Sequence, residues 1–377
     1  MNRIFTILTF TVIVGVAGAV FWLGKESDKV VALKPQTPVP PYSYNVEDIL
    51  VTSSDPAVAL GGTLAVPFGE GPFPAVILLS VAGPNDRDQS FAGHKGFHVL
   101  ADHLASNGVA VARFDDRGVE DSTGDYFDAS WEDLSEDALA VVARLKSESR
   151  IDPSKIGFAG MSQGGAIGAL TTQADSEIAF LVLMSAPGLP GEEALSLQLE
   201  KTLEVSGVKG DRAARYRKLF YEFMEIAKSD SEDIATRQRM KEFLNGPGKA
   251  LIPPYQFMPR DTDGLADVLL GSWYRSNIFF DPQTTYGRLE IPVLAIGGER
   301  DFVAPPDHHL ANIERILAQA PSSDVTITVF PGLNHLLQEA ETGLPTEYAS
   351  LQNSLSSDVL ATISGWIDDR FRKNTAQ

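Results

Sequence analysis

A serine flanked by glycines is the residue of this chain best suited to nucleophilic chemistry. The pentapeptide Gly160–Gly164 reads G-M-S-Q-G and follows a short apolar stretch, Ile156–Ala159. The glycines permit a sharp turn from strand to helix that exposes Ser162, and the next residue opens the helix. A serine hydroxyl is a weak nucleophile until a base removes its proton. We therefore expect Ser162 to be a nucleophile and the backbone N–H of Gln163 to stabilise an oxyanion.

One of the six histidines has the right position to be that base. His335 stands in the loop after the apolar stretch Val325–Phe330, which reads as the last strand. A histidine there can reach over the edge of a sheet toward a serine at another strand end. We therefore predict that His335 is the general base.

A carboxylate should orient this histidine, and the preceding strand end offers several. Asp301 follows the stretch Ile296–Arg300, in which two glycines end a strand. A carboxylate at this position would accept the Nδ1–H of His335, fix its tautomer and stabilise the imidazolium. Glu299 on the same turn is the second candidate, and Asp307 is the third.

The second oxyanion donor is expected in the loop that follows the apolar strand Ala75–Val81. This loop reads S-V-A-G-P-N-D-R-D over Ser80–Asp88. We predict the backbone N–H of Ala82 as the donor, with that of Val81 as the alternative. The charged residues of the loop are suited to ion pairs that brace it.

Other residues could bind a metal or line a substrate pocket. His94 and His98 are spaced as ligands on one helix turn, but no nearby carboxylate completes a site, so we predict no metal. Nor does the chemistry require an organic cofactor. Aromatic residues before residue 285 are equally suited to a pocket and to a plain core. The residues predicted to line a pocket are Met161, Trp273, Tyr274 and Phe279.

The elements that must position these residues follow a strand–helix rhythm. Strands that are apolar on both faces and alternate with helices predict a mostly parallel sheet with helices on both faces. Residues 190–285 interrupt this rhythm and are predicted to be an inserted, mainly helical cap over the C-terminal edge of the strands. The core is then formed by residues 46–189 and 286–377. Predicted helices include 96–106, 308–318 and a terminal helix from about 351 to 371.

The first residues favour export. Arg3 precedes an apolar run over residues 4–23, about as long as a membrane-spanning helix of roughly 17–25 residues. Residues 1–24 are predicted to be either a signal peptide cleaved near Ala17–Ala19 or an uncleaved membrane anchor. The proline-rich residues 25–45 are predicted to be a linker. Both alternatives place the catalytic domain in the periplasm or outside the cell.

Composition excludes several classes of function. The chain has 377 residues, enough for one large core with an inserted subdomain. Its net charge of −19 argues against binding to nucleic acid or to anionic lipid. We therefore expect membrane contact only through the N-terminal segment. The absence of cysteine excludes disulfides, thiolate zinc sites and a cysteine nucleophile.

Together these motifs resemble those of bacterial α/β-hydrolase esterases related to dienelactone hydrolases and to prolyl-oligopeptidase-type catalytic domains. The resemblance covers about Val46 to Arg370. The chain departs from the usual pattern at Val81, Ala82 and Glu120, where glycine, serine and glycine are common. The resemblance rests on Ser80–Asp88, Asp115–Gly124, Gly160–Gly165, Gly298–Asp301 and Asn334–His335.

The resemblance implies an α/β-hydrolase fold and a serine esterase that acts on small-molecule carboxylic esters of short to medium acyl chain. Such an enzyme works through a Ser-His-Asp triad and an acyl-enzyme. A serine peptidase and a thioesterase are alternatives within the hydrolases. Outside the enzymes, the alternative is an inactive hydrolase fold that serves as a binding protein.

Overall fold

The computed structural model describes residues 32–251, 259 and 261–372 of the chain. These residues fall into two compact units. The α/β unit contains residues 32–126, 132–188 and 282–372, and the helical unit contains residues 127–131, 189–251, 259 and 261–281. The predicted signal or anchor over residues 1–24 lies outside the described residues. Within the described part, no helix combines the length and the apolar character needed to cross a membrane.

The α/β unit is built on one large sheet, whose described strands lie in the order β1-β2-β6-β3-β7-β8-β9-β10. The β1–β2 and β2–β6 pairs are antiparallel, and all other neighbouring pairs are parallel. A short hairpin of β4 (Ser90–Phe91) and β5 (His94–Lys95) lies apart from it. The strands are β1 (Tyr44–Thr52), β2 (Ala59–Pro67), β3 (Phe73–Leu79), β6 (Ala110–Phe114), β7 (Ile151–Met161), β8 (Leu181–Met184), β9 (Val293–Gly298) and β10 (Val325–Phe330).

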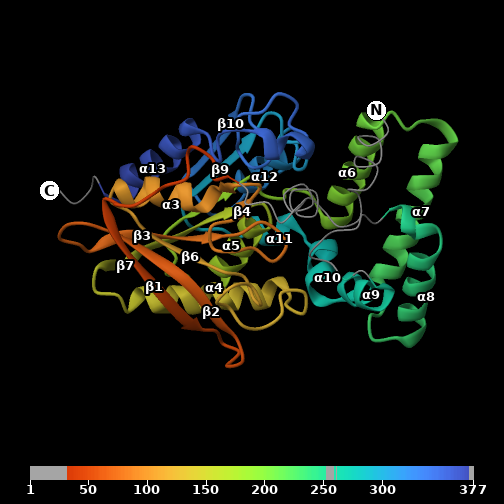
Figure 1. Ribbon diagram of the computed structural model, residues 1–377, viewed down its shortest axis with the longest axis horizontal. Helices are drawn as coiled ribbons and strands as arrows, with labels where there is room; N and C mark the ends of the chain where they lie inside the picture. Colours follow the sequence, from red (N-terminus) through yellow and green to blue (C-terminus); the bar gives the residue numbers. More distant parts are fainter. Residues whose placement is uncertain (1–31, 252–258, 260, 373–377) are drawn as a thin grey trace. The chain divides into compact units, whose positions relative to one another are not determined.

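Helices cover both faces of this sheet (Figure 1). On one face α3 (Gly96–Ser106) packs beside α13 (Ser357–Phe371). On the other face α4 (Trp131–Lys146) lies beside α5 (Gln163–Ala174), and the short α11 (Pro282–Tyr286) contacts both α5 and α12 (His309–Leu317). Every residue of β8 is buried, as expected for a strand covered on both faces. The predicted mostly parallel, doubly covered sheet is therefore present.

The terminal helix begins about six residues later than the sequence predicts. Residues 345–350 form a short 3₁₀-helix, η2 (Pro345–Ser350), and α13 starts only at Ser357. Between them, the backbone N–H groups of Ser354 and Leu355 donate to the side-chain oxygen of Gln36, at 2.7 and 3.0 Å. The prediction of helix over 351–356 is wrong because these N–H groups bind a distant side chain.

The described part of the predicted linker is held against the α/β unit. Lys34 Nζ donates to the carbonyl of Ala349 at 2.8 Å, and Gln36 Nε2 donates to that of Leu355 at the same distance. The ring of Tyr42 stacks on Tyr44 of β1, with 5.2 Å between centroids. Residues just before β1 therefore belong to the packed body of this unit.

The helical unit encloses an aromatic core. Phe220, Phe223, Trp273 and Tyr274 are almost completely buried in it. That this unit caps the strand ends remains a prediction. Its elements are α6 (Gly191–Val205), α7 (Gly210–Lys228), α8 (Ile234–Asn245), η1 (Pro247–Ala250), α9 (Thr262–Leu270) and α10 (Ser272–Phe279).

Candidate active site

Ser162 lies in the sharp turn between β7 and α5. Its φ of 53° and ψ of −121° are rare for a residue with a side chain and store strain in the turn. The Ser162 N–H donates to the carbonyl of Met184 at 2.8 Å, and the Gly165 N–H donates to the carbonyl of Ser162 at 2.9 Å. The side chain is half-buried. A turn of this kind presents its central side chain at the edge of the sheet.

Two glycines let this turn pack closely on its neighbours. A Cβ atom on Gly160 would collide with the backbone of Gly164. A Cβ atom on Gly164 would collide with the carbonyl of Leu79 and lie 2.6 Å from that of Ser80. Since Ser80 begins the loop after β3, the missing side chain of Gly164 brings the start of α5 directly against that loop.

His335 and Asp301 form a buried pair at the ends of the neighbouring parallel strands β9 and β10. His335 Nδ1 lies 2.8 Å from Asp301 Oδ2, and neither side chain is more than 1% exposed. With its hydrogen on Nδ1, a neutral imidazole keeps a lone pair on Nε2, the form that a general base needs. His335 Nε2 is buried and has no hydrogen-bond partner among the described residues. It is therefore available to accept a proton from a hydroxyl.

The two carboxylate oxygens of Asp301 have separate partners. The backbone N–H groups of Val303 and Ala304 both donate to Oδ1, each at 2.8 Å. This leaves Oδ2 for the histidine and fixes the plane of the carboxylate. The ring of His335 is therefore oriented by a group that is itself held in place.

The other two acidic candidates have different partners. Glu299 is exposed, and its carboxylate accepts the N–H of Gly332 at 2.9 Å. Asp307 is also exposed and lies 3.7 Å from His308. Of the three carboxylates considered from the sequence, the structure brings Asp301 to hydrogen-bonding distance from His335.

Ala82, in the loop after β3, lies between two residues whose backbone N–H groups have hydrogen-bond partners. The N–H of Val81 donates to Gln89 Oε1 at 3.3 Å, and that of Gly83 donates to the hydroxyl of Tyr126 at 3.0 Å. Ala82 lies between them, and its N–H is left without a partner among the described residues. An oxyanion hole requires a fixed donor of this kind. Of the two donors considered, the geometry favours Ala82.

The orientation of the Ala82 N–H is fixed by Asn85. Asn85 Nδ2 donates to the carbonyl of Val81 at 2.8 Å. That carbonyl and the N–H of Ala82 belong to the same planar peptide unit, so a bond to one fixes the direction of the other. The N–H therefore points to the opposite side from Asn85.

Asp116, just after β6, anchors the same loop. Its carboxylate accepts from Ser80 Oγ and from the backbone N–H of Asn85, both at 2.8 Å. Burial, the largest influence, raises the pKa of Asp116 to about 7 against the lowering effect of these hydrogen bonds. The loop is thus tied to a carboxyl group that titrates near neutral pH.

Ion pairs brace the loop, as its charged residues predict. Arg87 Nη2 lies 2.5 Å from Asp115 Oδ2 and 2.6 Å from Asp121 Oδ2. Asp88 pairs with Arg113. These contacts connect the loop that follows β3 with strand β6 and with the turn that follows β6.

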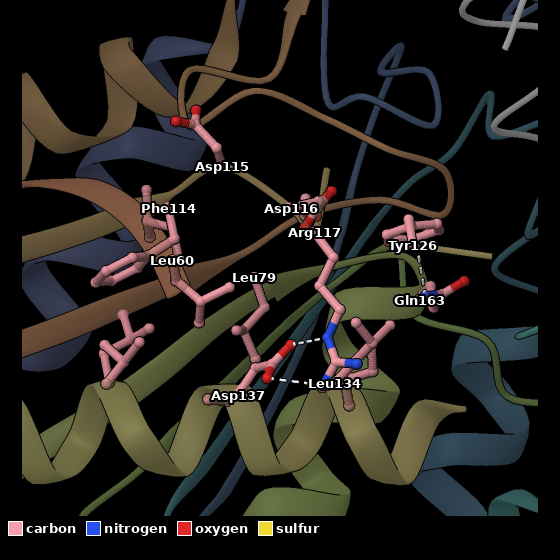
Figure 2. Close-up of a pocket in the computed structure, with 16 residues that line it drawn as sticks. Leu60, Leu79, Phe114, Asp115, Asp116, Arg117, Tyr126, Leu134, Asp137 and Gln163 are labelled. Carbon is pink, nitrogen blue, oxygen red and sulfur yellow. Dashed lines mark hydrogen bonds and ion pairs between the residues drawn. The ribbon is translucent and has the colours of Figure 1, made fainter. Parts of the chain in front are cut away.

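A cavity of about 60 Å³ lies beside the start of the loop, inside the α/β unit (Figure 2). It is bounded by Asp116, Tyr126, Gln163 and the ion pair of Arg117 with Asp137, whose Nε and Oδ2 atoms are 2.6 Å apart. One water needs roughly 10–15 Å³ of such volume, so the cavity suits a few waters and no acyl chain. Packing around Ser80 is therefore incomplete, and the start of the loop also relies on its hydrogen bonds to Asp116.

The residues predicted to line a substrate pocket lie in different surroundings. Met161 is buried as the last residue of β7. Trp273 and Tyr274 are buried in the helical unit, where the Trp273 ring meets that of Phe127 at a centroid distance of 5.3 Å. Phe279 is 53% exposed. The pocket assignment remains a prediction.

The two histidines considered as metal ligands have other neighbours. His94 Nδ1 lies 3.0 Å from Ser354 Oγ, and its Nε2 lies 3.1 Å from the carbonyl of Tyr348. His98 lies on α3, 3.9 Å from Asp88. Within the described ranges, no cluster of three or more histidine or acidic side chains is placed to hold a metal ion.

Three residues that hold the loop, Asn85, Gln89 and Tyr126, do not stand out in the sequence. Asn85 lies inside a recognisable motif, which is a usable signal. Gln89 and Tyr126 lie just outside the motifs Ser80–Asp88 and Asp115–Gly124. Their roles depend on contacts with distant residues, and no local spacing encodes such contacts.

Comparison with known proteins agrees with this architecture. Residues 77–344 match the family described as the Alpha/beta hydrolase family. The chain is 27% identical to esterase EstD of Thermotoga maritima over an alignment of 338 positions, which covers 87% of this chain and 69% of EstD. The range matched by the family, residues 77–344, includes the Ser162 turn, Asp301 and His335.

Two solved structures have a similar fold. The structure of DcsB with its substrate analogue gives a TM-score of 0.53 at 17% identity and covers 86% of this chain and 99% of DcsB. The structure of an esterase of Pyrococcus furiosus gives a TM-score of 0.52 at 16% identity. The similarity covers 90% of this chain and 98% of the Pyrococcus esterase. The fold and the family resemblance predicted from the sequence are confirmed. The chain belongs to the alpha/beta hydrolase family.

Proposed function

We propose that this chain is a serine esterase that cleaves carboxylic esters of short to medium acyl chain through Ser162, His335 and Asp301. The observation that carries the proposal is the buried Asp301–His335 pair at 2.8 Å. Its free end, His335 Nε2, has no partner among the described residues and lies in the same unit as the strained Ser162 turn. The similarity to esterase EstD supports an ester as the substrate.

In the first half of the proposed reaction, Ser162 Oγ attacks the carbonyl carbon of the ester while His335 Nε2 takes its proton. The negative charge that develops on the carbonyl oxygen is stabilised by the N–H groups of Gln163 and Ala82. The bond to the leaving alcohol then breaks, and His335 returns the proton to the alcohol oxygen. Ser162 is left acylated.

In the second half, a water molecule attacks the acyl carbon while His335 accepts its proton. The same N–H groups stabilise the second tetrahedral intermediate. His335 then protonates Ser162 Oγ as the acid leaves, which restores the starting state. Asp301 keeps the proton on Nδ1 throughout, so that Nε2 alone exchanges protons.

The test is hydrolysis of p-nitrophenyl esters from acetate to laurate by the full chain and by Ser162→Ala. We expect turnover by the wild type, a maximum at short or medium chain length and a loss of at least about 10³-fold in the variant. Adding a thioester and a p-nitroanilide peptide to the panel separates the thioesterase and peptidase alternatives. Faster turnover of either than of every ester would reject the esterase assignment.

Labelling with a fluorophosphonate tests the nucleophile independently of the substrate. We expect the probe to modify the wild type at Ser162 and to leave Ser162→Ala unmodified. A folded wild type that neither reacts with the probe nor hydrolyses any substrate would instead support a binding protein with an inactive site.

We also propose that the enzyme acts outside the cytoplasm, on the basis of the apolar run over residues 4–23. Fractionation of a bacterial host that expresses the full chain tests this directly. Sequencing the N-terminus of the exported protein then separates a cleaved signal peptide from a retained anchor. Recovery of all the protein in the cytoplasm would reject export.

A further inference from the structure

We propose that Tyr126 is a positioning residue for the oxyanion hole. Its hydroxyl connects the loop that carries Ala82 to the start of the helix that carries Gln163. The two donors would then be held at a fixed separation by one hydroxyl group. This role rests on the proposed esterase function.

The geometry consists of two hydrogen bonds to one oxygen. The N–H of Gly83 donates to the Tyr126 hydroxyl oxygen at 3.0 Å. Gln163 Nε2 donates to the same oxygen at 3.0 Å, as Figure 2 shows. Gly83 is the residue after Ala82, and Gln163 is itself the other proposed donor. Tyr126 is only 3% exposed, so water does not compete strongly for these bonds.

The bond to Gly83 complements the one that Asn85 makes. Asn85 fixes the peptide unit before Cα of Ala82, through the carbonyl of Val81. Tyr126 fixes the peptide unit after it, through the N–H of Gly83, where φ is 102° and the chain turns sharply. With both flanking peptide planes held, the position of Ala82 in the loop is fixed as well as the direction of its N–H.

Tyr126 also adds a connection that Asp116 does not supply. Asp116 ties the loop to the end of β6, through Ser80 and Asn85. Tyr126 ties the loop to the first residue of α5. The cavity of about 60 Å³ lies between these attachment points, so side-chain packing does not replace the hydroxyl there.

Loss of the hydroxyl should act on the transition state more than on substrate binding. A misplaced group can cost about 10²-fold in rate, and loss of a whole oxyanion donor costs about 10²–10³-fold. For Tyr126→Phe we therefore expect kcat to fall about 10- to 100-fold while KM changes less than about twofold. The phenyl ring still fills the same space, so the fold should be retained.

The experiment measures kcat and KM for p-nitrophenyl butyrate and Ki for an aryl trifluoromethyl ketone, which forms a tetrahedral adduct with serine. The control is Tyr44→Phe, because Tyr44 is also buried and its hydroxyl donates to Asp102 at 3.0 Å, between β1 and α3. We expect Ki to rise in Tyr126→Phe by about the factor that kcat falls. We expect both constants to be unchanged in Tyr44→Phe.

A second variant guards against misfolding of the first. Gln163→Leu removes the other end of the same connection and keeps the backbone N–H of residue 163. We expect it to lower kcat without raising KM, and we expect the double variant with Tyr126→Phe to be little worse than the poorer single variant. If the double variant instead lost kcat by the full product of the two single-variant losses, Tyr126 and Gln163 would not act through one connection.

The outcomes separate this inference from the proposed function. Tyr126→Phe with the kcat and Ki of the wild type would overturn the role of Tyr126 and leave the esterase intact. An equal fall in kcat for Tyr44→Phe would also overturn the role of Tyr126, because removal of a buried tyrosine hydroxyl far from the loop would then have the same effect. A wild type with no turnover and no fluorophosphonate labelling would overturn both.

Discussion

At the residue scale, the candidate base depends on a carboxylate whose two oxygens have different partners. The backbone N–H groups of Val303 and Ala304 require an acceptor at Oδ1 of Asp301. The opposite oxygen, Oδ2, then faces His335 Nδ1 at 2.8 Å and fixes the tautomer of the ring. Two backbone groups therefore determine, through Asp301, which nitrogen of His335 carries the proton.

This arrangement predicts the effect of Asp301→Asn. The amide oxygen should take the Oδ1 position, because only an acceptor satisfies the two backbone donors. The amide N–H would then face Nδ1, force the proton of His335 onto Nε2 and remove the base. We expect kcat for p-nitrophenyl butyrate to fall about 10⁴-fold, with the melting temperature changed by only a few degrees.

Glu299→Gln is the matched control, since Glu299 lies on the same turn and Gln keeps an oxygen for the N–H of Gly332. We expect its kcat to equal that of the wild type within about twofold. A large loss in Glu299→Gln together with a small loss in Asp301→Asn would transfer the role of the acid to Glu299.

At the element scale, the turn between β7 and α5 must lie against the end of β3. Because Gly164 has no side chain, α5 can begin next to the carbonyl groups of Leu79 and Ser80. Gly365 in α13 is a useful contrast, since an added Cβ there would have no neighbour within 4 Å. The same change, glycine to alanine, should therefore have opposite effects at the two positions.

We expect Gly164→Ala to lower the free energy of unfolding by about 1–3 kcal/mol, as overpacking typically does, and to abolish esterase activity. We expect Gly365→Ala to raise it by about 0.5–1 kcal/mol, because alanine is the better helix former, with activity unchanged. Urea unfolding and ester hydrolysis measure both effects. Full activity in Gly164→Ala would show that the turn tolerates displacement.

The same elements show what the sequence can predict. Buried strands such as β3 and helices such as α3 stand out because continuous apolar runs and a helical apolar face are local patterns. The start of α13 was mispredicted because Gln36 binds the N–H groups of residues 354 and 355. The contacts of Tyr126 were likewise unpredictable, since they join residues about 40 positions apart.

At the scale of the whole molecule, three buried groups link stability to pH with opposite signs. Burial is the largest influence on the pKa of His94 and of His309, and it lowers both from 6.5 to about 4. His309 Nδ1 accepts the N–H of Gly188 at 3.0 Å, which requires an unprotonated nitrogen. Burial also raises the pKa of Asp116 from 3.8 to about 7.

The signs follow from proton uptake on unfolding. Between pH 6.5 and about 4 the unfolded chain binds more protons at each histidine than the folded chain does, so acid lowers the free energy of unfolding. At Asp116 the folded chain binds the extra proton between about 7 and 3.8, so acid raises the free energy of unfolding there. On acidification, the two histidines therefore lower the free energy of unfolding, whereas Asp116 raises it.

Melting temperatures from pH 8 to pH 4, at constant ionic strength, should therefore decrease toward acid in the wild type. The decrease should be steeper in Asp116→Asn, which loses the opposing contribution and keeps groups that can bond to Ser80 and to the N–H of Asn85. It should be shallower in His94→Gln, whose amide can still donate to the carbonyl of Tyr348. Because the two variants shift the slope in opposite directions, a general loss of stability cannot imitate the result. Parallel curves of melting temperature against pH for the wild type and both variants would mean that other groups control unfolding by acid.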